Sequence, residues 1–485
     1  MSSIKELEPK VIWENFYALT QIPRPSKKEE KIIAYMEKFG KDLGLETIVD
    51  DIKNVIIRKP ATPGMENRQG IILQAHLDMV PQKNSDVTFD FEKDAIQAYV
   101  DGEWVKAKGT TLGADNGMGV AAAMAVLQAK DIVHGPIEAL FTIDEETGMT
   151  GAKNLQPNVL KGQILINLDS EDEGELYVGC AGGLDGSFTY TYKEEAVPAG
   201  HEAYKLSVTG LKGGHSGMDI ILYRGNANKI MCRFLKQAIR ELGVRIGTID
   251  GGSLRNAIPR EAFATITVAK DKAENLKQML KAYYEIVAAE YSIADPGLKI
   301  ELANEAAPKS VMDEKTQLAL VDGVQACPND VIRMNDAMQG LVETSSNLAI
   351  VKAADGKASV SCLMRSSVDT AKADLANAME SVFRMAGAEC EFAGGYNGWK
   401  PNMDSAILKT MKETYKKLYG KDAEIKAIHA GLECGILSEP YPSWDMISIG
   451  PTIRHPHSPD EKVKIDTVAK FWSFLVAVLK DAPVK

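Results

Sequence analysis

The stretch Gly70-Ile-Ile-Leu-Gln-Ala-His-Leu-Asp78 is an apolar run that ends in a histidine and an aspartate. Its apolar residues predict a buried β-strand that finishes at His76. Residues two apart in a strand lie on one face, so Asp78 can hydrogen-bond the His76 ring and fix which ring nitrogen faces a metal. Taken alone, the pair is more typical of an ordinary polar strand end.

Similar strands lie on both sides of this stretch and alternate with helices. Ser26 and Glu29 match the capping-box pattern, which predicts that a helix begins there. Strands are predicted at 54–58, 70–76, 137–143 and 163–168, and helices at 27–43 and 117–130. This alternation is typical of an α/β domain with a mixed, largely parallel sheet and helices on both faces.

A change of sequence pattern divides the chain into two domains. After the glycine-rich stretch 179–186, strands alternate with longer helices, and near residue 398 the first pattern resumes. We therefore expect an outer domain made of residues 1–184 and 398–485, and an inserted α+β domain at 185–397. Within the insertion, a strand followed by a helix at 256–290 recurs in the same order at 347–385, which predicts two similar halves.

Carboxylates follow two of the predicted strands. Asp144, Glu145 and Glu146 come directly after the strand at 137–143, and Asp169 follows the strand at 163–168. The crevice beyond the carboxyl ends of strands is where open α/β sheets usually bind ligands. A cation bound there would relieve the repulsion between the acidic groups, and a solvated acidic loop is the alternative interpretation.

Two further segments could complete a metal site. Asp115 lies between a glycine-containing turn and an alanine-rich helix, where helix capping is the simpler explanation. Near the C-terminus, His455 and His457 are two of only seven histidines, and either is a candidate last ligand or simply an exposed residue. The six cysteines form no Cys-x-x-Cys pair, so any metal has to be held by histidine and carboxylate.

Together these segments supply the ligands of a two-metal centre. His76, Asp115, Glu146, Asp169 and one late histidine provide two imidazoles and three carboxylates. The ligands then carry less negative charge than the positive charge of two divalent ions, which leaves an electrophilic centre. With one carboxylate bridging, ions about 3.5 to 4 Å apart can bind a water between them and lower its pKa toward neutrality.

Composition narrows the class of protein. The chain has 485 residues, of which 45% are hydrophobic and 25% charged, as in folded soluble proteins of two or three domains. A formal net charge of −11 disfavours nucleic acid as a partner. No stretch approaches the ~18 uninterrupted apolar residues of a membrane helix. We therefore expect a cytoplasmic protein with no membrane partner.

Seven motifs follow one another in a recognisable order. They are Ala75-His-Leu-Asp-Met79, Gly113-Ala-Asp-Asn-Gly117, Asp144-Glu-Glu-Thr-Gly148, Asn167-Leu-Asp-Ser170, Gly213-Gly-His-Ser-Gly217, Gly431-Leu-Glu-Cys-Gly435 and His455-Pro-His-Ser458. In this order they resemble the zinc metallopeptidase family that includes aminoacylase and the bacterial tripeptidases. The resemblance covers essentially the whole chain.

The resemblance implies two zinc ions per chain, with Co²⁺ or Mn²⁺ as alternatives. His76, Asp115 and Asp169 would hold one ion, while Asp115, Glu146 and His457 would hold the other. Asp115 would therefore bridge the two ions, and the family has a cis peptide bond after this residue.

The resemblance also assigns roles to two neighbours of these ligands. Asp78 would orient His76, and Glu145 would be the general base that takes a proton from a metal-bridging water and passes it to the leaving amine. Adjacent side chains in extended backbone point in opposite directions, so Glu145 and Glu146 can divide the roles of base and ligand.

Residues of the inserted domain match other functional positions of the family. His215 would stabilise the oxyanion of the tetrahedral intermediate. Asn256 and Arg365 of the insertion, together with the Gly431 segment of the outer domain, match substrate-contacting positions. Arg365 can pair with the terminal carboxylate of a dipeptide, and a surface ion pair is the alternative. Because these residues would have to reach the metals, the insertion is expected to act as a lid.

The function implied is hydrolysis of short peptides, above all Xaa-His dipeptides such as β-alanyl-histidine. An N-acyl amino-acid amidohydrolase or a tripeptidase with the same metal centre is the second enzymatic hypothesis, because specificity depends on lid contacts. A non-catalytic peptide-binding module is the third, although the ligands and the base are all present. The expected partner is a small peptide, and a homodimer is also compatible with the resemblance.

Overall fold

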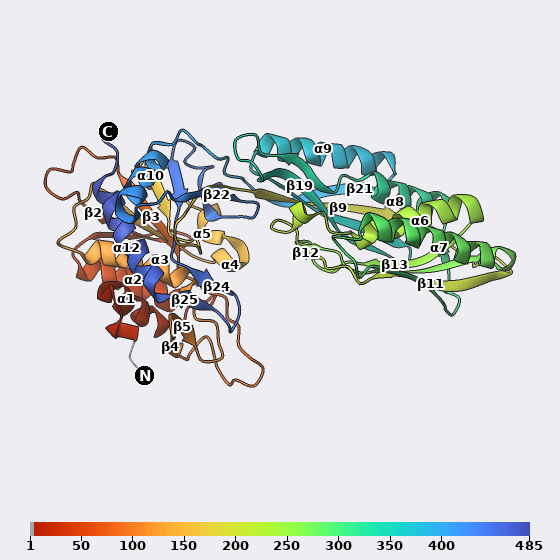
Figure 1. The fold of residues 1–485 in the computed structure, drawn as a ribbon, viewed down its shortest axis with the longest axis horizontal. Coiled ribbons are helices and arrows are strands. Elements are labelled where there is room, and N and C mark those ends of the chain that lie inside the picture. Colours follow the sequence, from red (N-terminus) through yellow and green to blue (C-terminus); the bar gives the residue numbers. More distant parts are fainter. Residues whose placement is uncertain (1–3) are drawn as a thin grey trace. The chain divides into compact units, whose positions relative to one another are not determined.

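The computed structural model describes residues 4–485, which form two compact units. Unit 1 contains the chain up to Cys180 together with Trp399–Ala427 and Leu432–Lys485, and unit 2 contains Ala181–Gly398 and Ile428–Gly431. Unit 2 is therefore inserted into unit 1 (Figure 1). The short segment that ends at Gly431 packs with unit 2, whereas the sequence pattern places it in the outer domain.

The sheet of unit 1 has eight strands, and its four central strands are parallel. β3 (Ile71–His76) pairs in parallel with β6 (Ile137–Thr142) and with β7 (Ile164–Asn167), and β23 (Asp445–Ser448) lies parallel to β7. The outer strands are β1 (Glu46–Val49), β2 (Val55–Lys59), β8 (Glu175–Cys180) and β22 (Glu424–Ile428). Every residue of β3, β6 and β7 is buried, and most of these residues are apolar, as expected for strands that are covered on both faces. The predicted mixed, largely parallel sheet is confirmed.

Helices pack against this sheet and against one another (Figure 1). α3 packs on β3 and on α1, while α10 packs on β23 and on α12. The helices are α1 (Lys10–Thr20), α2 (Glu30–Asp42), α3 (Ala114–Gln128), α10 (Ala406–Tyr419) and α12 (Ile465–Lys480), with the short η1 (Ile4–Glu6), α4 (Glu145–Gly148), α5 (Thr150–Lys153) and α11 (Glu433–Leu437). A small second sheet contains β4 (Ala98–Asp101), β5 (Trp104–Ala107), β24 (Ile453–Arg454) and β25 (Lys462–Lys464).

The predicted capping box before α2 is wrong. The helix begins at Glu30, and no side chain caps it. The Ser26 hydroxyl instead donates a hydrogen bond to Asp78 Oδ2 at 2.8 Å, and Glu29 Oε1 accepts one from the backbone N–H of Asp144 at 3.0 Å. Both residues therefore bind segments that are distant in the sequence, and both of those segments lead to the candidate site.

Unit 2 is built on a nine-stranded antiparallel sheet made of two halves. Each half has the order strand, helix, two strands, helix, strand. The first half contains β11 (His201–Thr209), α6 (Ala227–Leu242), β13 (Arg245–Gly251), β15 (Ala262–Ala269), α7 (Ala273–Glu290) and β16 (Lys299–Asn304). The second contains β9 (Gly182–Thr191), α8 (Glu314–Ala326), β19 (Val342–Ala354), β20 (Lys357–Ser366), α9 (Asp369–Met385) and β21 (Glu389–Tyr396). The predicted α+β insertion of two similar halves is confirmed.

The two halves are joined edge to edge and interleaved in sequence. β13 pairs antiparallel with β19, with Ile249 opposite Ala353. The first strand of the second half, β9, precedes the whole first half along the chain. The remaining short elements are β10 (Glu194–Glu195), β12 (Gly214–His215), η2 (Ile220–Leu222), β14 (Ala257–Ile258), η3 (Lys270–Lys272), β17 (Val311–Met312) and β18 (Asp330–Met334).

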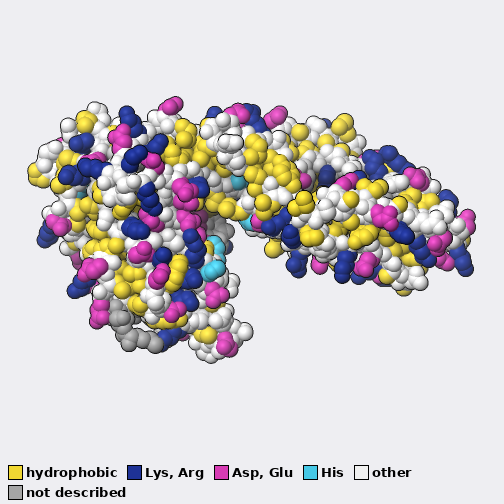
Figure 2. Space-filling view, viewed as in Figure 1, with side chains coloured by type: hydrophobic (Ala, Val, Ile, Leu, Met, Phe, Trp, Pro, Cys, Tyr) yellow, Lys and Arg dark blue, Asp and Glu magenta, His cyan; other side chains and the backbone are white. Residues whose placement is uncertain are grey.

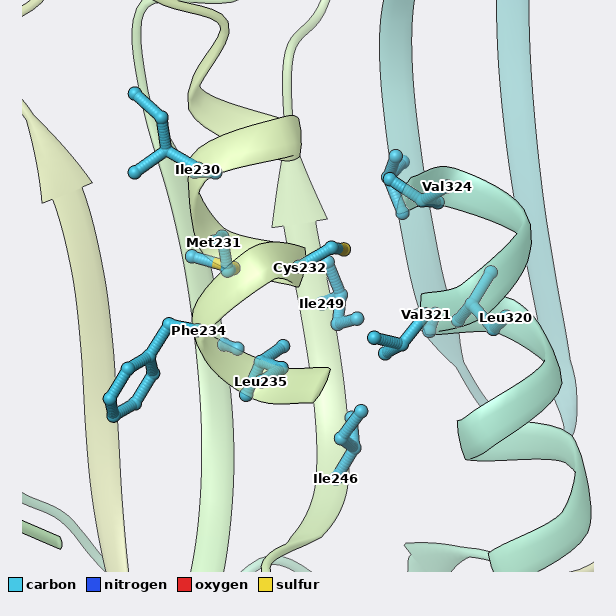
Figure 3. Packing of buried hydrophobic residues seen from close by; sticks show 14 of the residues in the cluster. Ile230, Met231, Cys232, Phe234, Leu235, Ile246, Ile249, Leu320, Val321 and Val324 are labelled. Carbon is cyan, nitrogen blue, oxygen red and sulfur yellow. The ribbon is translucent and has the colours of Figure 1, made fainter. Parts of the chain in front are cut away.

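One hydrophobic core fills the space between the helices and the sheet of unit 2. Figure 3 shows α6 presenting Cys232 and Leu235 toward β13, with Leu320 of α8 in the same cluster. Phe188 of β9 stacks on Phe383 of α9 with ring centroids 3.9 Å apart. This cluster contains residues of both halves, so the two halves share one core.

Acidic and basic side chains are interspersed over the face shown in Figure 2, as expected for a chain with 56 Lys and Arg and 67 Asp and Glu. Within residues 4–485, no helix is both long and apolar enough to span a membrane. All six cysteines lie within residues 4–485, and none of them forms a disulfide bond.

Candidate metal centre

Five predicted ligands converge at one edge of the sheet of unit 1. His76 is the last residue of β3, Asp169 follows β7, and Glu146 lies in α4, which follows β6. The three strands are parallel, so their carboxyl ends meet at the same edge. Asp115 comes from the start of α3, and His457 comes from the loop after β24.

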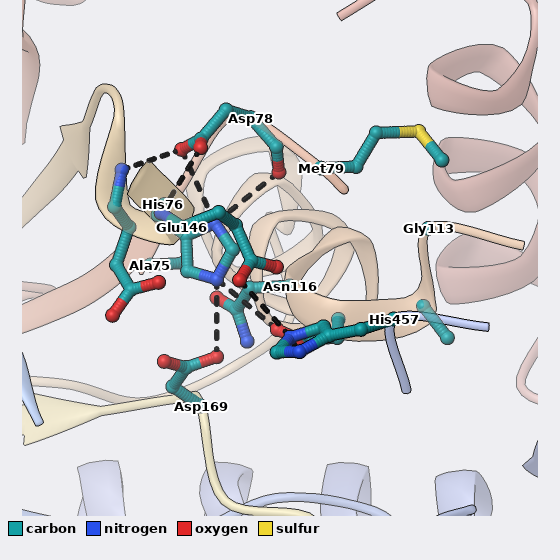
Figure 4. Close-up of polar contacts among 12 residues, drawn as sticks. Ala75, His76, Asp78, Met79, Gly113, Asn116, Glu146, Asp169 and His457 are labelled. Carbon is teal, nitrogen blue, oxygen red and sulfur yellow. Dashed lines mark hydrogen bonds and ion pairs between the residues drawn. The ribbon is translucent and has the colours of Figure 1, made fainter. Parts of the chain in front are cut away.

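The carboxylate of Asp115 lies between His76 and His457. Figure 4 shows these two histidines together with Glu146 and Asp169. Its Oδ1 is 3.1 Å from His76 Nε2, and its Oδ2 is 3.1 Å from His457 Nε2. Asp169 Oδ1 lies 3.5 Å from His76 Nε2, and Glu146 Oε2 lies 3.0 Å from His457 Nε2. The geometry therefore gives two groups of three side chains that share Asp115. His455 is exposed and belongs to neither group.

Asp78 organises the segment that carries Glu145 and Glu146. Its carboxylate accepts the backbone N–H of Glu145 at 3.0 Å and that of Glu146 at 3.2 Å, and its Oδ1 lies 3.4 Å from His76 Nδ1. The two glutamates begin the helix α4, so the expectation that extended backbone separates their side chains is wrong. The N–H groups at the start of a helix have no acceptor within the helix, and the Asp78 carboxylate accepts two of them. The expected cis peptide bond is present between Asp115 and Asn116.

The clustered carboxylates create a strongly negative environment for both imidazoles. Hydrogen bonds to Asp115 and Glu146 raise the pKa of His457 to about 11. Burial alone would lower the pKa of His76, but Asp169 and Asp115 outweigh it and raise that pKa well above its ordinary value. Burial raises the pKa of Asp169 to about 7. Such an environment favours the binding of positive charge.

The donor set fits a pair of divalent cations. In each group, one ligand atom per residue lies within 4.8 Å of the others, with His76, Asp115 and Asp169 in one group and Asp115, Glu146 and His457 in the other. Glu146 Oε1 is buried and has no hydrogen-bond partner among residues 4–485. Two imidazoles and three carboxylates are ligands that Zn²⁺, Co²⁺ and Mn²⁺ accept.

Gln74 of β3, Thr142 of β6 and Asn167 of β7 form a buried hydrogen-bonded network with Glu433. Glu433 accepts hydrogen bonds from Gln74 Nε2 at 2.6 Å and from the Thr142 hydroxyl at 2.8 Å, and Asn167 donates to Gln74 Oε1 at 2.6 Å. All four residues are fully buried. Gln74 and Asn167 precede His76 and Asp169 by two positions. Sequence reasoning missed this network, although two polar residues inside apolar strands were a visible signal.

In unit 2, His215 is held in one tautomer. It lies in β12, which pairs with β14, and its Nδ1 accepts the backbone N–H groups of Gly217 at 3.2 Å and Met218 at 3.1 Å. A neutral imidazole whose Nδ1 is an acceptor carries its proton on Nε2, which then acts as a donor. Burial and the nearby charge of Arg365 lower the pKa of His215, so this neutral form is favoured.

Arg365 is a buried cation without an acidic partner among residues 4–485. Its side chain is 5% exposed and donates to the Ser216 hydroxyl at 3.4 Å and to the Tyr396 hydroxyl at 3.3 Å. The surface ion pair considered as the alternative is therefore absent from this part of the chain. Ser345 is the cross-strand partner of Arg365 and binds His429 Nε2 at 2.6 Å. Sequence reasoning missed both Tyr396 and His429.

The other two predicted substrate residues also belong to unit 2. Asn256 is exposed, and its backbone carbonyl accepts the N–H of Ser216 at 2.9 Å. Gly431 is the last residue of the segment that packs with unit 2. Asn256 is thus connected to His215 through the backbone of Ser216.

The fold and this constellation of residues define a peptidase of known type. The chain matches the model of Peptidase family M20/M25/M40 over residues 72–481, and it belongs to that family. The cytosol non-specific dipeptidase of Escherichia coli (strain K12) is 48% identical over 485 residues, which is 100% of both chains. The crystal structure of aminoacylhistidine dipeptidase from Vibrio alginolyticus is 49% identical, with a TM-score of 0.95 over 100% of this chain and 99% of that one.

A more distant structure shares the fold alone. The aminopeptidase PepT of Bacillus cereus ATCC 10987 has a TM-score of 0.57 and 17% identity, and the match covers 98% of this chain and 99% of that chain.

Proposed function

We propose that this chain is a two-metal dipeptidase that hydrolyses short peptides, including Xaa-His dipeptides such as β-alanyl-histidine. The observation that carries the proposal is the position of Asp115, whose two oxygens each lie 3.1 Å from a different histidine. A single carboxylate placed in this way suits two adjacent cations. Relatives named as a non-specific dipeptidase and an aminoacylhistidine dipeptidase support the substrate class.

The five candidate ligands would hold two divalent ions, which when bound polarise a peptide carbonyl and lower the pKa of an attacking water. Glu145 would accept the proton of that water and pass it to the leaving amine. Its carboxylate lies within 4.8 Å of donor atoms of His76 and Glu146, so the base and the ligands face one region. Asp78 would hold His76 in the required orientation.

Unit 2 would supply the groups that recognise the rest of the substrate. His215 offers a neutral Nε2–H, which suits the oxyanion of a tetrahedral intermediate. Arg365 offers a buried guanidinium with no carboxylate partner in the described chain, which suits the terminal carboxylate of a dipeptide. Asn256 and Gly431 would complete the substrate contacts. In this proposal unit 2 is a lid, because these groups act on a substrate bound at the metals of unit 1.

The proposal is tested by removing and restoring metal. Protein treated with a chelator should lose turnover of β-alanyl-histidine, and added Zn²⁺, Co²⁺ or Mn²⁺ should restore it, with the best ion identifying the metal. Elemental analysis of untreated protein should give two ions per chain. Full activity in protein shown to be metal-free would contradict the proposal.

A substrate panel separates the proposal from the second enzymatic hypothesis. Xaa-His dipeptides, other dipeptides, tripeptides and N-acetyl amino acids should be assayed side by side, and we expect dipeptides with a free amino group to be hydrolysed fastest. Faster turnover of N-acetyl amino acids would identify an amidohydrolase with the same centre. We also propose a cytoplasmic location, as in the named relative, and size-exclusion chromatography with light scattering would test the homodimer.

A further inference from the structure

Glu461 is a buried carboxylate in the same loop as the candidate ligand His457. Its side chain is 2% exposed, and it lies between Ser458 and β25. It belongs to neither group of candidate ligands. A buried carboxylate needs several hydrogen bonds to offset its loss of hydration, so its partners reveal what it does.

Within residues 4–485, the hydrogen bonds to its carboxylate all come from backbone N–H groups of one segment, the segment that leads into Asp115. Oε2 accepts from Leu112 at 2.7 Å and from Gly113 at 3.0 Å, while Oε1 accepts from Ala114 at 2.7 Å and from Asp115 at 3.2 Å. These residues lie at the start of α3, where N–H groups have no partner within the helix. Glu461 therefore uses both oxygens to fix four consecutive residues, of which the last is the shared ligand.

The same segment is held from its carbonyl side by a buried arginine. Arg24 Nη2 donates to the carbonyl of Gly113 at 2.5 Å, and Nη1 donates to the carbonyls of Leu77 at 2.9 Å and Asp78 at 3.0 Å. Arg24 is 2% exposed. Glu461 and Arg24 thus hold the backbone before Asp115 from opposite sides, and Arg24 connects it to the segment that follows His76.

We propose that Glu461 is a positioning residue that holds Asp115 and His457 at the spacing required to bind one metal ion. Two facts carry the proposal. Glu461 is covalently part of the His457 loop, and its carboxylate is bound to the N–H of Asp115 itself. No other residue described here connects the backbones of these two candidate ligands in this way. This inference rests on the proposed function in one respect, because it takes the five candidate ligands as a metal centre.

The test uses Glu461→Gln in the full-length chain, with Zn²⁺ as the probe. Glutamine has nearly the same shape, but its amide nitrogen donates and cannot accept two of the four N–H groups. We expect one Zn²⁺ equivalent to bind about 10- to 100-fold more weakly, as is typical when a partner of a ligand is removed. The other equivalent should keep an affinity closer to that of the unsubstituted protein. Competition with a chromophoric chelator measures both affinities without any substrate.

A matched control separates positioning from general stability. Glu138 is also buried, at 6% exposure, and accepts the backbone N–H groups of Lys161 at 2.7 Å and Gly162 at 2.8 Å. It also accepts the Arg58 Nε–H at 2.8 Å, and it lies in β6 away from the candidate ligands. Glu138→Gln should lower thermal stability and leave both Zn²⁺ affinities unchanged. Glu461→Asp keeps two acceptor oxygens and should restore part of the lost affinity.

The outcomes distinguish this proposal from the proposed function. Unchanged Zn²⁺ affinities in Glu461→Gln, or equal losses in Glu138→Gln, would overturn the role of Glu461. If Glu461→Gln does not fold, Glu461→Asp alone must still bind one equivalent more weakly than the unsubstituted chain, and equal binding would overturn the role. Failure of the unsubstituted chain to bind two Zn²⁺, or to hydrolyse dipeptides, would instead count against the proposed function.

Discussion

Replacing Glu145 by glutamine should stop the chemistry and leave the metal centre intact. The contact of Glu145 with Asp78 is made by its backbone N–H, at 3.0 Å, which the substitution retains. Its side chain has no hydrogen bond to any of the five candidate ligands in the structure. The variant should therefore lose only the proton acceptor. Loss of general base catalysis costs about 10²- to 10⁴-fold in kcat, or about 3 to 5 kcal/mol in activation free energy.

The assay measures kcat, KM and metal content on the same preparation. We expect kcat for β-alanyl-histidine to fall by the stated factor, while KM changes little and elemental analysis still gives two ions per chain. Equal kcat values for the two proteins would rule out Glu145 as the base. Loss of metal together with activity would assign Glu145 to the ligand set, for which its position near His76 and Glu146 makes it a candidate.

Three further predictions concern Asp78 beside the candidate ligands and two buried positions of unit 2. Asp78→Asn should weaken metal binding about 10- to 100-fold in a Zn²⁺ titration, because the carboxylate that faces His76 Nδ1 at 3.4 Å loses its charge. Burial, and then Arg365, lower the pKa of His429 to about 3, so the folded protein keeps this ring neutral. Its contribution to the free energy of unfolding is complete above the unfolded pKa of about 6.5 and is lost at up to about 1.4 kcal/mol per pH unit as pH falls toward 3. Urea unfolding from pH 7 to pH 5 should therefore show a smaller loss in His429→Gln than in the unsubstituted chain. Leu320→Ala, at a fully buried position of unit 2, should lower the free energy of unfolding by about 2 to 5 kcal/mol without changing the metal content of unit 1.

The central strands of the unit 1 sheet could be predicted from the sequence, because a strand that is buried on both faces is mostly apolar. β3 is predicted from its mostly apolar sequence, and all six of its residues are buried. The prediction of a capping box failed because its two side chains make long-range contacts and not local ones. Ser26 binds Asp78 and Glu29 binds the backbone of Asp144, and both partners are distant in the sequence. A local pattern cannot show that a distant partner competes for the same side chain.

The candidate ligands could be predicted because most of them follow recognisable strands, and the ends of parallel strands meet in space. Glu461 and Glu433 could not be assigned in this way. Glu461 binds the N–H of Asp115, from which it is separated by 346 positions in the sequence, and Glu433 of α11 binds Gln74 of β3. An acidic residue in a loop or beside a glycine looks the same in the sequence whether it faces water or a buried backbone. Only the arrangement of the strands distinguishes these cases.

Three buried side chains each link two of the chain segments that carry the candidate ligands. They are Asp78, Asn116 and Glu461. Asp78 accepts the N–H of Glu146 and faces His76. Asn116, the neighbour of Asp115, donates to the carbonyl of Leu168 at 2.8 Å, next to Asp169. Glu461 connects the segment at Asp115 with the loop of His457.

These three connections include every candidate ligand at least once, and Asp115 is the ligand that two of them share. The ligand side chains themselves make few other hydrogen bonds, so their positions depend on the backbone that carries them. A centre held in this way is organised before any cation binds, which lowers the cost of assembling five ligands from distant parts of the chain. It also means that substitutions at Asp78, Asn116 and Glu461 should affect different pairs of ligands.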